Sequence, residues 1–407
     1  MLRRISLIAF FLLPSLSLFS QTDEIRIKIS GFVKADYWID SRRNQEGVDG
    51  MLVYYPSAPG FNSNGIDTNS FWSTHGVALS TRIKLTATGP ELFGAKTAGV
   101  VEADFTGTTD VALFRLRLAN VTFTWSKSNL LVGQAWHPLS IPQFLPKTLS
   151  LNTGAPFQCF NRSPQITYTH TLGSFRVLGS INFQSSFESL GPKGKSSIYL
   201  KNAVLPNLDF QLQKSLGKST FGIAYDFKML RPFITNVGKD GSHYVNENKV
   251  KSHSALLFYN YTSEKLFIIA KQLWGQNLTE HLMQGGYGVT SIDSITGIQN
   301  YTPSKGWTSI LNFCYGTKYK VGGTLGFMKN NGFDKNIVKF YGRDANIKST
   351  LRIAPNVVYA IKNLQLGVEC EYNRTTWGKV DMNKMGKVVT PTTVNGVRIL
   401  SILQYNF

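Results

Sequence analysis

Hydrophobic and polar residues alternate one by one along many segments of this chain, and this pattern constrains the fold more than any other feature. The segments are rich in Val, Ile, Thr, Tyr and Phe, as is typical of β-strands with one polar and one apolar face. After residue 20, no apolar stretch approaches the roughly 20 residues of a membrane-spanning helix. We predict sixteen strands, at 25–39, 76–88, 96–105, 112–124, 128–134, 163–171, 174–184, 206–214, 218–229, 250–262, 265–275, 306–316, 319–328, 347–360, 364–376 and 394–407.

The connections between these strands alternate between short and long. Residues 172–173 and 215–217 are short, whereas 40–75, 135–162 and 276–305 are long. Outer-membrane barrels have this rhythm because their periplasmic turns are tight and their extracellular loops are long. We therefore predict an all-β fold, a transmembrane antiparallel β-barrel of about 16 strands, forming a single domain over residues 21–407.

The two faces of the predicted strands suit a barrel in lipid. In 76–88, five apolar residues oppose four polar ones: Val77, Leu79, Ile83, Leu85 and Ala87 against Ser80, Arg82, Lys84 and Thr86. In 364–373, Leu366 and Val368 oppose Glu369 and Glu371. Water lies inside a barrel and lipid outside, so the apolar face is predicted to point outward.

Both ends of the chain carry export features. Arg3 and Arg4, the apolar run 5–13 and a small residue at Ser20 predict a cleaved secretory signal peptide over residues 1–20. At the other end, Tyr405 and Phe407 complete an alternating strand, and we expect them to be read by the barrel-insertion machinery. The predicted location is the outer membrane of a Gram-negative bacterium, in contact with its lipid.

The formal net charge is +19, and removing the two signal-peptide arginines leaves +17. Such basicity suits nucleic acid, anionic lipid or anionic solutes. The export signal and the scattered arrangement of Lys and Arg argue against nucleic acid. Three widely spaced cysteines, Cys159, Cys314 and Cys370, form no disulfide framework or metal motif.

No catalytic or cofactor motif stands out. None of the six histidines has a zinc-type spacing partner, and there is no Gly-x-Ser-x-Gly or phosphate-binding loop. We expect no enzyme activity, no cofactor and no metal site, although a Ser–His pair on adjacent strands would escape this search.

Charged residues alternate on three consecutive predicted strands. Two basic residues on the first are followed by two acids and then by two more basic residues: Arg82 and Lys84, Glu102 and Asp104, Arg115 and Arg117. One interpretation is a lumen constriction that favours anions, with the acids holding the basic side chains in place. A cross-strand charge ladder on any solvated face explains the alternation equally well.

Residues 135–165 hold five of the fifteen prolines, so this segment is not a central strand. Its many apolar residues argue against disorder. It is the third long loop, and we expect it to fold into the barrel and narrow it. Lys147 and Arg162 would then join the lumen charges.

Several segments resemble the DcaP-like trimeric porins. They are Gly99-Val-Val-Glu-Ala-Asp-Phe, Phe114-Arg-Leu-Arg-Leu-Ala-Asn, Leu131-Val-Gly-Gln-Ala-Trp, Pro146-Lys-Thr-Leu and Asn161-Arg-Ser-Pro-Gln-Ile-Thr-Tyr. The resemblance covers about 96–170. It implies sixteen strands, a homotrimer and passage of small negatively charged molecules such as dicarboxylates, with Arg115, Arg117 and Arg162 at the family's basic positions. The chain departs from the family in having no N-terminal helical extension and in continuing Gln-x-Trp as His137-Pro138.

The sequence thus predicts a porin, a channel for passive diffusion of small, preferentially anionic solutes through a basic lumen. The alternative is a non-transport barrel that displays its long loops for adhesion or for docking a partner. The clusters at Tyr54 and Tyr55 and in 285–301 would suit such recognition.

Overall fold

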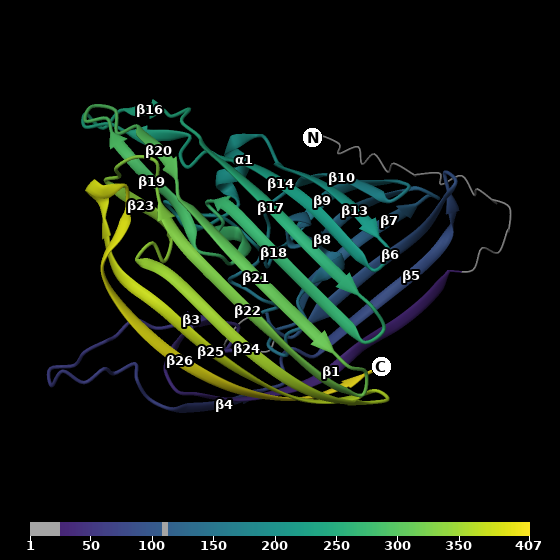
Figure 1. Ribbon diagram of the computed structural model, residues 1–407. Helices are drawn as coiled ribbons and strands as arrows, with labels where there is room; N and C mark the ends of the chain where they lie inside the picture. Colours follow the sequence, from purple (N-terminus) through teal and green to yellow (C-terminus); the bar gives the residue numbers. More distant parts are fainter. Residues whose placement is uncertain (1–24, 108–112) are drawn as a thin grey trace, which may run out of the picture.

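The computed structural model describes residues 25–107 and 113–407, and the predicted signal peptide lies outside them. Sixteen wall strands form one antiparallel barrel (Figure 1), in which β4 and β5 together make a single wall strand. The wall consists of β1 (Arg26–Asp40), β4 (Ser73–Val77), β5 (Arg82–Leu92), β6 (Ala95–Asp104), β7 (Arg115–Thr124), β8 (Ser128–Trp136), β9 (Arg162–Leu172), β10 (Phe175–Asn182), β13 (Asn207–Leu216), β14 (Ser219–Leu230), β17 (Val250–Thr262), β18 (Leu266–Gln276), β21 (Lys305–Tyr315), β22 (Tyr319–Gly332), β24 (Ile347–Ile361), β25 (Leu364–Asp381) and β26 (Lys387–Asn406).

The first and last strands close the barrel. Strand β1 pairs antiparallel with β26, and Ile39 lies opposite Ile399. At the end of this seam, the Gly31 N–H donates to the Phe407 carbonyl at 2.9 Å and the Phe407 N–H donates back at 3.1 Å. The predicted all-β barrel and its strand number are confirmed.

The long connections gather at one end of the barrel and contain short elements of their own (Figure 1). These are β2 (Asn44–Gly47), β3 (Leu52–Pro56), η1 (Pro138–Ser140), η2 (Pro142–Phe144), β11 (Leu190–Gly191), β12 (Gly194–Lys195), α1 (Ile198–Ala203), β15 (Thr235–Val237), β16 (His243–Val245), η3 (Thr279–His281), β19 (Gly285–Ile292), β20 (Gln299–Pro303), β23 (Lys339–Arg343) and η4 (Met382–Lys384). No helix of the described residues is both long and apolar enough to cross a bilayer.

The barrel is polar inside and apolar outside. On β25, Leu366 and Val368 are each 44% exposed on the outer surface, whereas Glu369 and Glu371 are buried. The largest fully buried side chains include the arginines at 117, 162, 352 and 398. A water-soluble protein has the opposite distribution, with apolar side chains inside. Apolar side chains outside and polar ones inside are expected of a barrel surrounded by lipid.

The predicted strand 76–88 is interrupted, and this corrects the assignment of its outward face. Phe32 and Asp36 of β1 are four residues apart, but their partners Arg82 and Val77 are five apart, so one extra residue lies between β4 and β5. An inserted residue of this kind shifts the side-chain alternation by one. Val77 and Leu79 consequently pack on the inner cluster around Trp38, not outward beside Ile83.

Lipid exposure predicts a large difference between two arginine substitutions. Leu257, on the outer face of β17, is 49% exposed, and Val245, in the loop strand β16, is 63% exposed. We expect Leu257→Arg to cost about 2–4 kcal/mol of folding free energy in a bilayer if it lies near the midplane. Val245→Arg should cost little, because this position lies among the long loops. Urea titration of refolding into phospholipid vesicles measures both, and equal costs would contradict the assigned membrane face.

Candidate functional site

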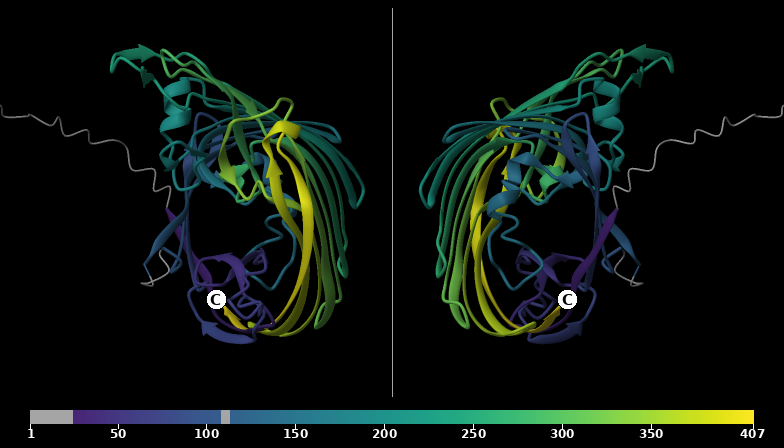
Figure 2. Two further views of the ribbon diagram at one scale, coloured as in Figure 1. Left: turned by 90° about the vertical axis from the view of Figure 1, so that its left-hand side faces the viewer. Right: turned by 90° about the vertical axis from the view of Figure 1, so that its right-hand side faces the viewer.

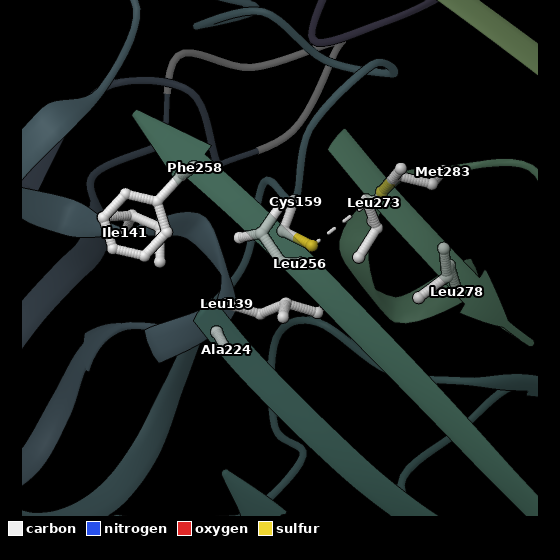
Figure 3. Close-up of a cluster of buried hydrophobic side chains, with 9 residues drawn as sticks. All are labelled: Leu139, Ile141, Cys159, Ala224, Leu256, Phe258, Leu273, Leu278 and Met283. Atoms are coloured by element: carbon white, nitrogen blue, oxygen red, sulfur yellow. Dashed lines mark hydrogen bonds between the residues drawn. The ribbon is translucent and has the colours of Figure 1, made fainter. Parts of the chain in front are cut away.

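Residues 137–161, here called loop L3, connect β8 to β9 and fold into the barrel. Figure 2 shows the strands as a ring around loop segments that lie inside it. On one side, apolar residues of L3 pack against β14, β17, β18 and the 277–304 connection (Figure 3). The buried cluster comprises Leu139, Ile141, Cys159, Ala224, Leu256, Phe258, Leu273, Leu278 and Met283. Burial of this apolar surface holds L3 against the wall, and the predicted inward-folded third loop is confirmed.

Polar wall residues hold the opposite side of L3. The Glu369 carboxylate accepts from the backbone N–H groups of Leu149 and Ser150 at 3.1 and 3.2 Å. The guanidinium of Arg352 donates to the carbonyl of Ala155 at 3.0 Å. Lys34 donates from β1 to the carbonyl of Leu149 at 2.7 Å. Wall side chains thereby satisfy the backbone groups of a buried loop, which would otherwise be costly.

The predicted charged residues of β5, β6 and β7 lie together and form ion pairs. Arg117 contacts Glu102 at 2.8 Å and Asp104 at 2.6 Å. Arg115 contacts Asp104 at 3.2 Å, and Arg82 contacts Glu102 at 3.6 Å. The acids of the middle strand therefore bridge the basic residues on either side.

The members of this ladder differ in exposure. Lys84 lies opposite Glu102 in the register of β5 and β6. The ladder contains four basic residues and two acids, so it keeps a surplus of two positive charges. Arg117 is buried, whereas the side chains of Arg82 and Arg115 remain 22% and 24% exposed. Arg82 and Arg115 are therefore the more accessible arginines of the ladder.

The sequence predicts Arg162 among the charges of the lumen, but its side chain is not exposed on the lumen wall. Its guanidinium is buried among the rings of Trp136, Phe160 and Phe187, with centroids 4.9, 5.0 and 5.0 Å away. Among the described residues, no carboxylate forms an ion pair with it. The contacts are of the cation–π type, so the aromatic rings enclose this charge.

A cavity of about 580 Å³ lies between L3 and the tight turns of the barrel. It is lined by five basic side chains and one acidic one: Lys34, Arg82, Lys147, Lys265, Lys320 and Glu264. Of the eight pathway residues predicted from sequence, Arg82 and Lys147 line it. The sequence pattern does not point to Lys265 and Lys320, because each is isolated on its own strand or turn. Lys34 alternates with Asp36, and this is a signal for an inward-facing position.

Lys147 reaches this cavity from L3. Its ammonium group lies 4.4 Å from the centroid of the Phe267 ring on β18. Basic side chains outnumber acidic ones on the lining of the cavity, and two of them pair with acids, Lys34 with Asp36 at 2.7 Å and Arg82 with Glu102 at 3.6 Å.

The barrel was compared with known proteins. No protein-family model and no curated protein matches the chain. Among solved structures, the outer membrane channel DcaP of Acinetobacter baumannii superposes with a TM-score of 0.66 at 15% identity, covering 96% of this chain and 99% of DcaP. The chain has the fold of an outer-membrane porin.

Two further porin-fold structures support this assignment. OmpT of Vibrio cholerae, folded in vitro and in its trimer form, has a TM-score of 0.57 at 10% identity and covers 95% of this chain and 100% of its own. OmpF of Salmonella typhi, in complex with daunomycin, has a TM-score of 0.54 at 8% identity, with coverages of 95% and 99%. At these identities the likeness concerns the fold, and the DcaP resemblance is confirmed at that level. By its fold the chain is an outer-membrane β-barrel.

The anchoring of L3 by Glu369 predicts a specific loss of stability. Glu369→Ala removes the acceptor of the buried Ser150 N–H and of the partly buried Leu149 N–H, and leaving a buried donor unsatisfied costs about 1–3 kcal/mol. We expect a lower unfolding midpoint in detergent and noisier single-channel current as L3 loosens. Gln365→Ala, on the same strand, is the control because Gln365 makes no hydrogen bond to L3 among the described residues. Equal effects of the two substitutions would contradict this anchoring role.

The thermal stability of the barrel is expected to depend on pH through a buried carboxyl at its loop end. The Tyr55 hydroxyl of β3 donates to the Asp344 carboxyl, which follows β23, and burial raises the pKa of Asp344 to about 6. A raised carboxyl pKa means that the stability it contributes is present at low pH and lost as pH rises through about 6. Asp344→Asn should therefore match the wild type near pH 4 and melt at a higher temperature near pH 7.5. A constant difference between the two melting curves over this range would exclude the effect.

Proposed function

We propose that this protein is a porin for passive diffusion of small, preferentially anionic solutes such as dicarboxylates. The observation that carries the proposal is the cavity beside L3, with five basic side chains and one acid on its lining. The porin fold supplies the channel scaffold. Charges on the low-dielectric protein wall of a water-filled passage set ion preference through their local electrostatic potential.

In this proposal the charged residues divide into two groups. Arg82, Lys147 and Arg115 act on the solute directly, since they are partly exposed or line the cavity. Glu102, Asp104 and buried Arg117 hold the ladder in place. Lys84 and Arg162 do not line the cavity, and they contribute positive electrostatic potential from a greater distance. Passage of the solute requires no covalent bond to form or break.

We propose no enzymatic role. A Ser–His pair does occur on adjacent strands, with Ser128 Oγ 2.8 Å from His170 Nδ1. The pair lies beside Tyr168, which is 48% exposed on the outer surface, and among the described residues no carboxylate contacts His170. A nucleophile needs an oriented base in a pocket, and this pair on the lipid-facing side has neither.

We also propose a homotrimer, by analogy with the trimer form of Vibrio cholerae OmpT, tested by the mass of the protein–detergent complex. Residues 1–20 are proposed to be a cleaved signal peptide. Tyr405 and Phe407, which are 52% and 48% exposed, are proposed to engage the insertion machinery.

The proposal predicts chloride preference across a planar bilayer under a tenfold KCl gradient. Arg82→Ser/Lys147→Ser should move the reversal potential toward the cation side, because it removes two cavity charges while leaving Arg117 paired. The shift should shrink as salt rises, since the screening length falls from about 10 Å at 0.1 M to about 3 Å at 1 M. Arg115→Ser/Arg117→Ser should shift selectivity the same way, although it leaves Asp104 without an ion-pair partner and Glu102 with Arg82 alone.

The control is Lys239→Ser/Lys335→Ser, which removes the same charge from two exposed loop positions. An unmoved reversal potential in the cavity variant, or an equal shift in the control, would refute the assigned pathway. A folded barrel without conductance would refute the porin function itself and favour loop display.

A further inference from the structure

A buried cluster of histidine and carboxylate side chains lies beside the start of L3. One ligand atom each from His137, Asp209 and Asp226 lie within 4.8 Å of one another. The side chains come from three segments: the start of L3, β13 and β14. Asp209 and Asp226 are direct cross-strand partners and both face inward. All three residues are at least nine-tenths buried, with 1%, 5% and 2% exposed.

One polar atom of each of these three residues lacks a partner among the described residues. Asp209 Oδ1, Asp226 Oδ2 and His137 Nε2 are buried and have no hydrogen-bond partner among the described residues. Within 4.0 Å of the two carboxylates, the one basic group of the described residues is the His137 ring, whose Nε2 lies 3.5 Å from Asp209 Oδ2. Two adjacent buried carboxylates without a cation are strongly unfavourable.

Nearby charges do not resolve this imbalance. Lys228 of β14 pairs with Glu280 and also donates to the carbonyl of Asn277. Lys271 donates to Ser140 and Gln158 of L3, at 2.6 Å each. Asp209, Asp226 and Glu280 against Lys228 and Lys271 leave a charge of −1 with His137 and His281 neutral, and neither lysine forms an ion pair with Asp209 or Asp226. A cation bound between these two carboxylates would offset their repulsion.

We infer that His137, Asp209 and Asp226 form a binding site for a divalent transition-metal ion such as Zn²⁺. Imidazole nitrogen with carboxylate oxygen is a donor set that suits zinc and its neighbours, whereas calcium and magnesium prefer oxygen alone.

Surrounding groups provide the outer sphere of this site. Asn182 donates to Asp209 Oδ2. The ring of His281, from η3, lies 4.7 Å from the His137 ring, and its Nε2 also has no hydrogen-bond partner among the described residues. His281 Nε2 lies 3.4 Å from Glu280 Oε1, so His281 belongs to the outer sphere of the site.

Metal binding requires one local change. His137 Nδ1 accepts from the Leu139 N–H at 3.3 Å, which leaves the ring proton on Nε2. Coordination through Nε2 requires that proton to leave, with Nδ1 protonated instead, and this long contact must then be given up. The ion would tie the first residue of L3 to two wall strands. Because L3 crosses the lumen, the site is a structural clamp on the loop that narrows the channel.

The test uses the folded full chain in detergent after EDTA treatment and dialysis. With ZnCl₂ as the probe, we expect one zinc ion bound per chain by elemental analysis and titration calorimetry, and a higher melting temperature with zinc. Cobalt substitution should give visible absorption bands of nitrogen and oxygen coordination. Asp226→Asn and His137→Gln should each weaken zinc binding by more than the roughly 10- to 100-fold effect of losing an outer-sphere partner.

The matched controls are Asp36→Asn, which alters another buried lumen carboxylate, and His243→Gln, which alters an exposed loop histidine. Both should bind zinc as the wild type does. If the folded wild type binds no zinc, the inference is overturned whatever the variants do. Equal zinc affinity of the Asp226→Asn variant and the wild type would also overturn it and favour a carboxyl pair that shares a proton. Neither result bears on anion selectivity, so this test is independent of the proposed function.

Discussion

Closure of the sheet between β1 and β26 is the constraint on which the rest of the structure depends. In lipid, every backbone N–H and C=O of the wall must find a partner within the protein, and only a closed barrel provides this for strands. The seam is held by a continuous register from Phe32↔Asn406 to Asp40↔Arg398 and by the reciprocal bonds of Gly31 and Phe407. Closure then creates an inside and an outside with opposite solvents.

The inside of the barrel is polar, and L3 is held there by two different forces. Its apolar residues bury themselves against β14, β17 and β18, and its backbone is bonded by charged wall residues such as Glu369 and Arg352. Arg352 also donates to the Val53 carbonyl at 2.9 Å, so the first long loop and L3 share one anchor. Buried charges in this barrel therefore serve as loop supports as well as a source of potential.

The charged residues of the barrel differ in exposure, as a division between loop support and the proposed solute pathway would require. Arg117 and Arg398 are buried and paired, the latter with Asp40 at 2.6 and 2.8 Å. Arg82 and Lys147 face the cavity. A buried, doubly paired arginine adds little field to the lumen because neighbouring acids offset it, whereas an exposed lysine near a cavity wall acts on a solute at close range.

The sequence by itself determined the class of fold, the sixteen wall strands, their lipid-facing sides and the presence of an inward loop. These follow from local rules: a side-chain period of two, tight turns and a proline-rich segment with apolar residues. It also brought the β5–β7 charges together, because consecutive strands pair. The exceptions were Val77 and Leu79, where one inserted residue reversed the alternation.

Only the tertiary structure decided which residues from distant segments meet. Lys34, Lys265 and Lys320 converge on one cavity, and His137 meets Asp209 and Asp226, although no spacing in the sequence relates them. It also enclosed Arg162 among aromatic rings. The physical reason is that these contacts depend on the path of L3 across the lumen, which is set by packing and hydrogen bonds to strands far away in the chain.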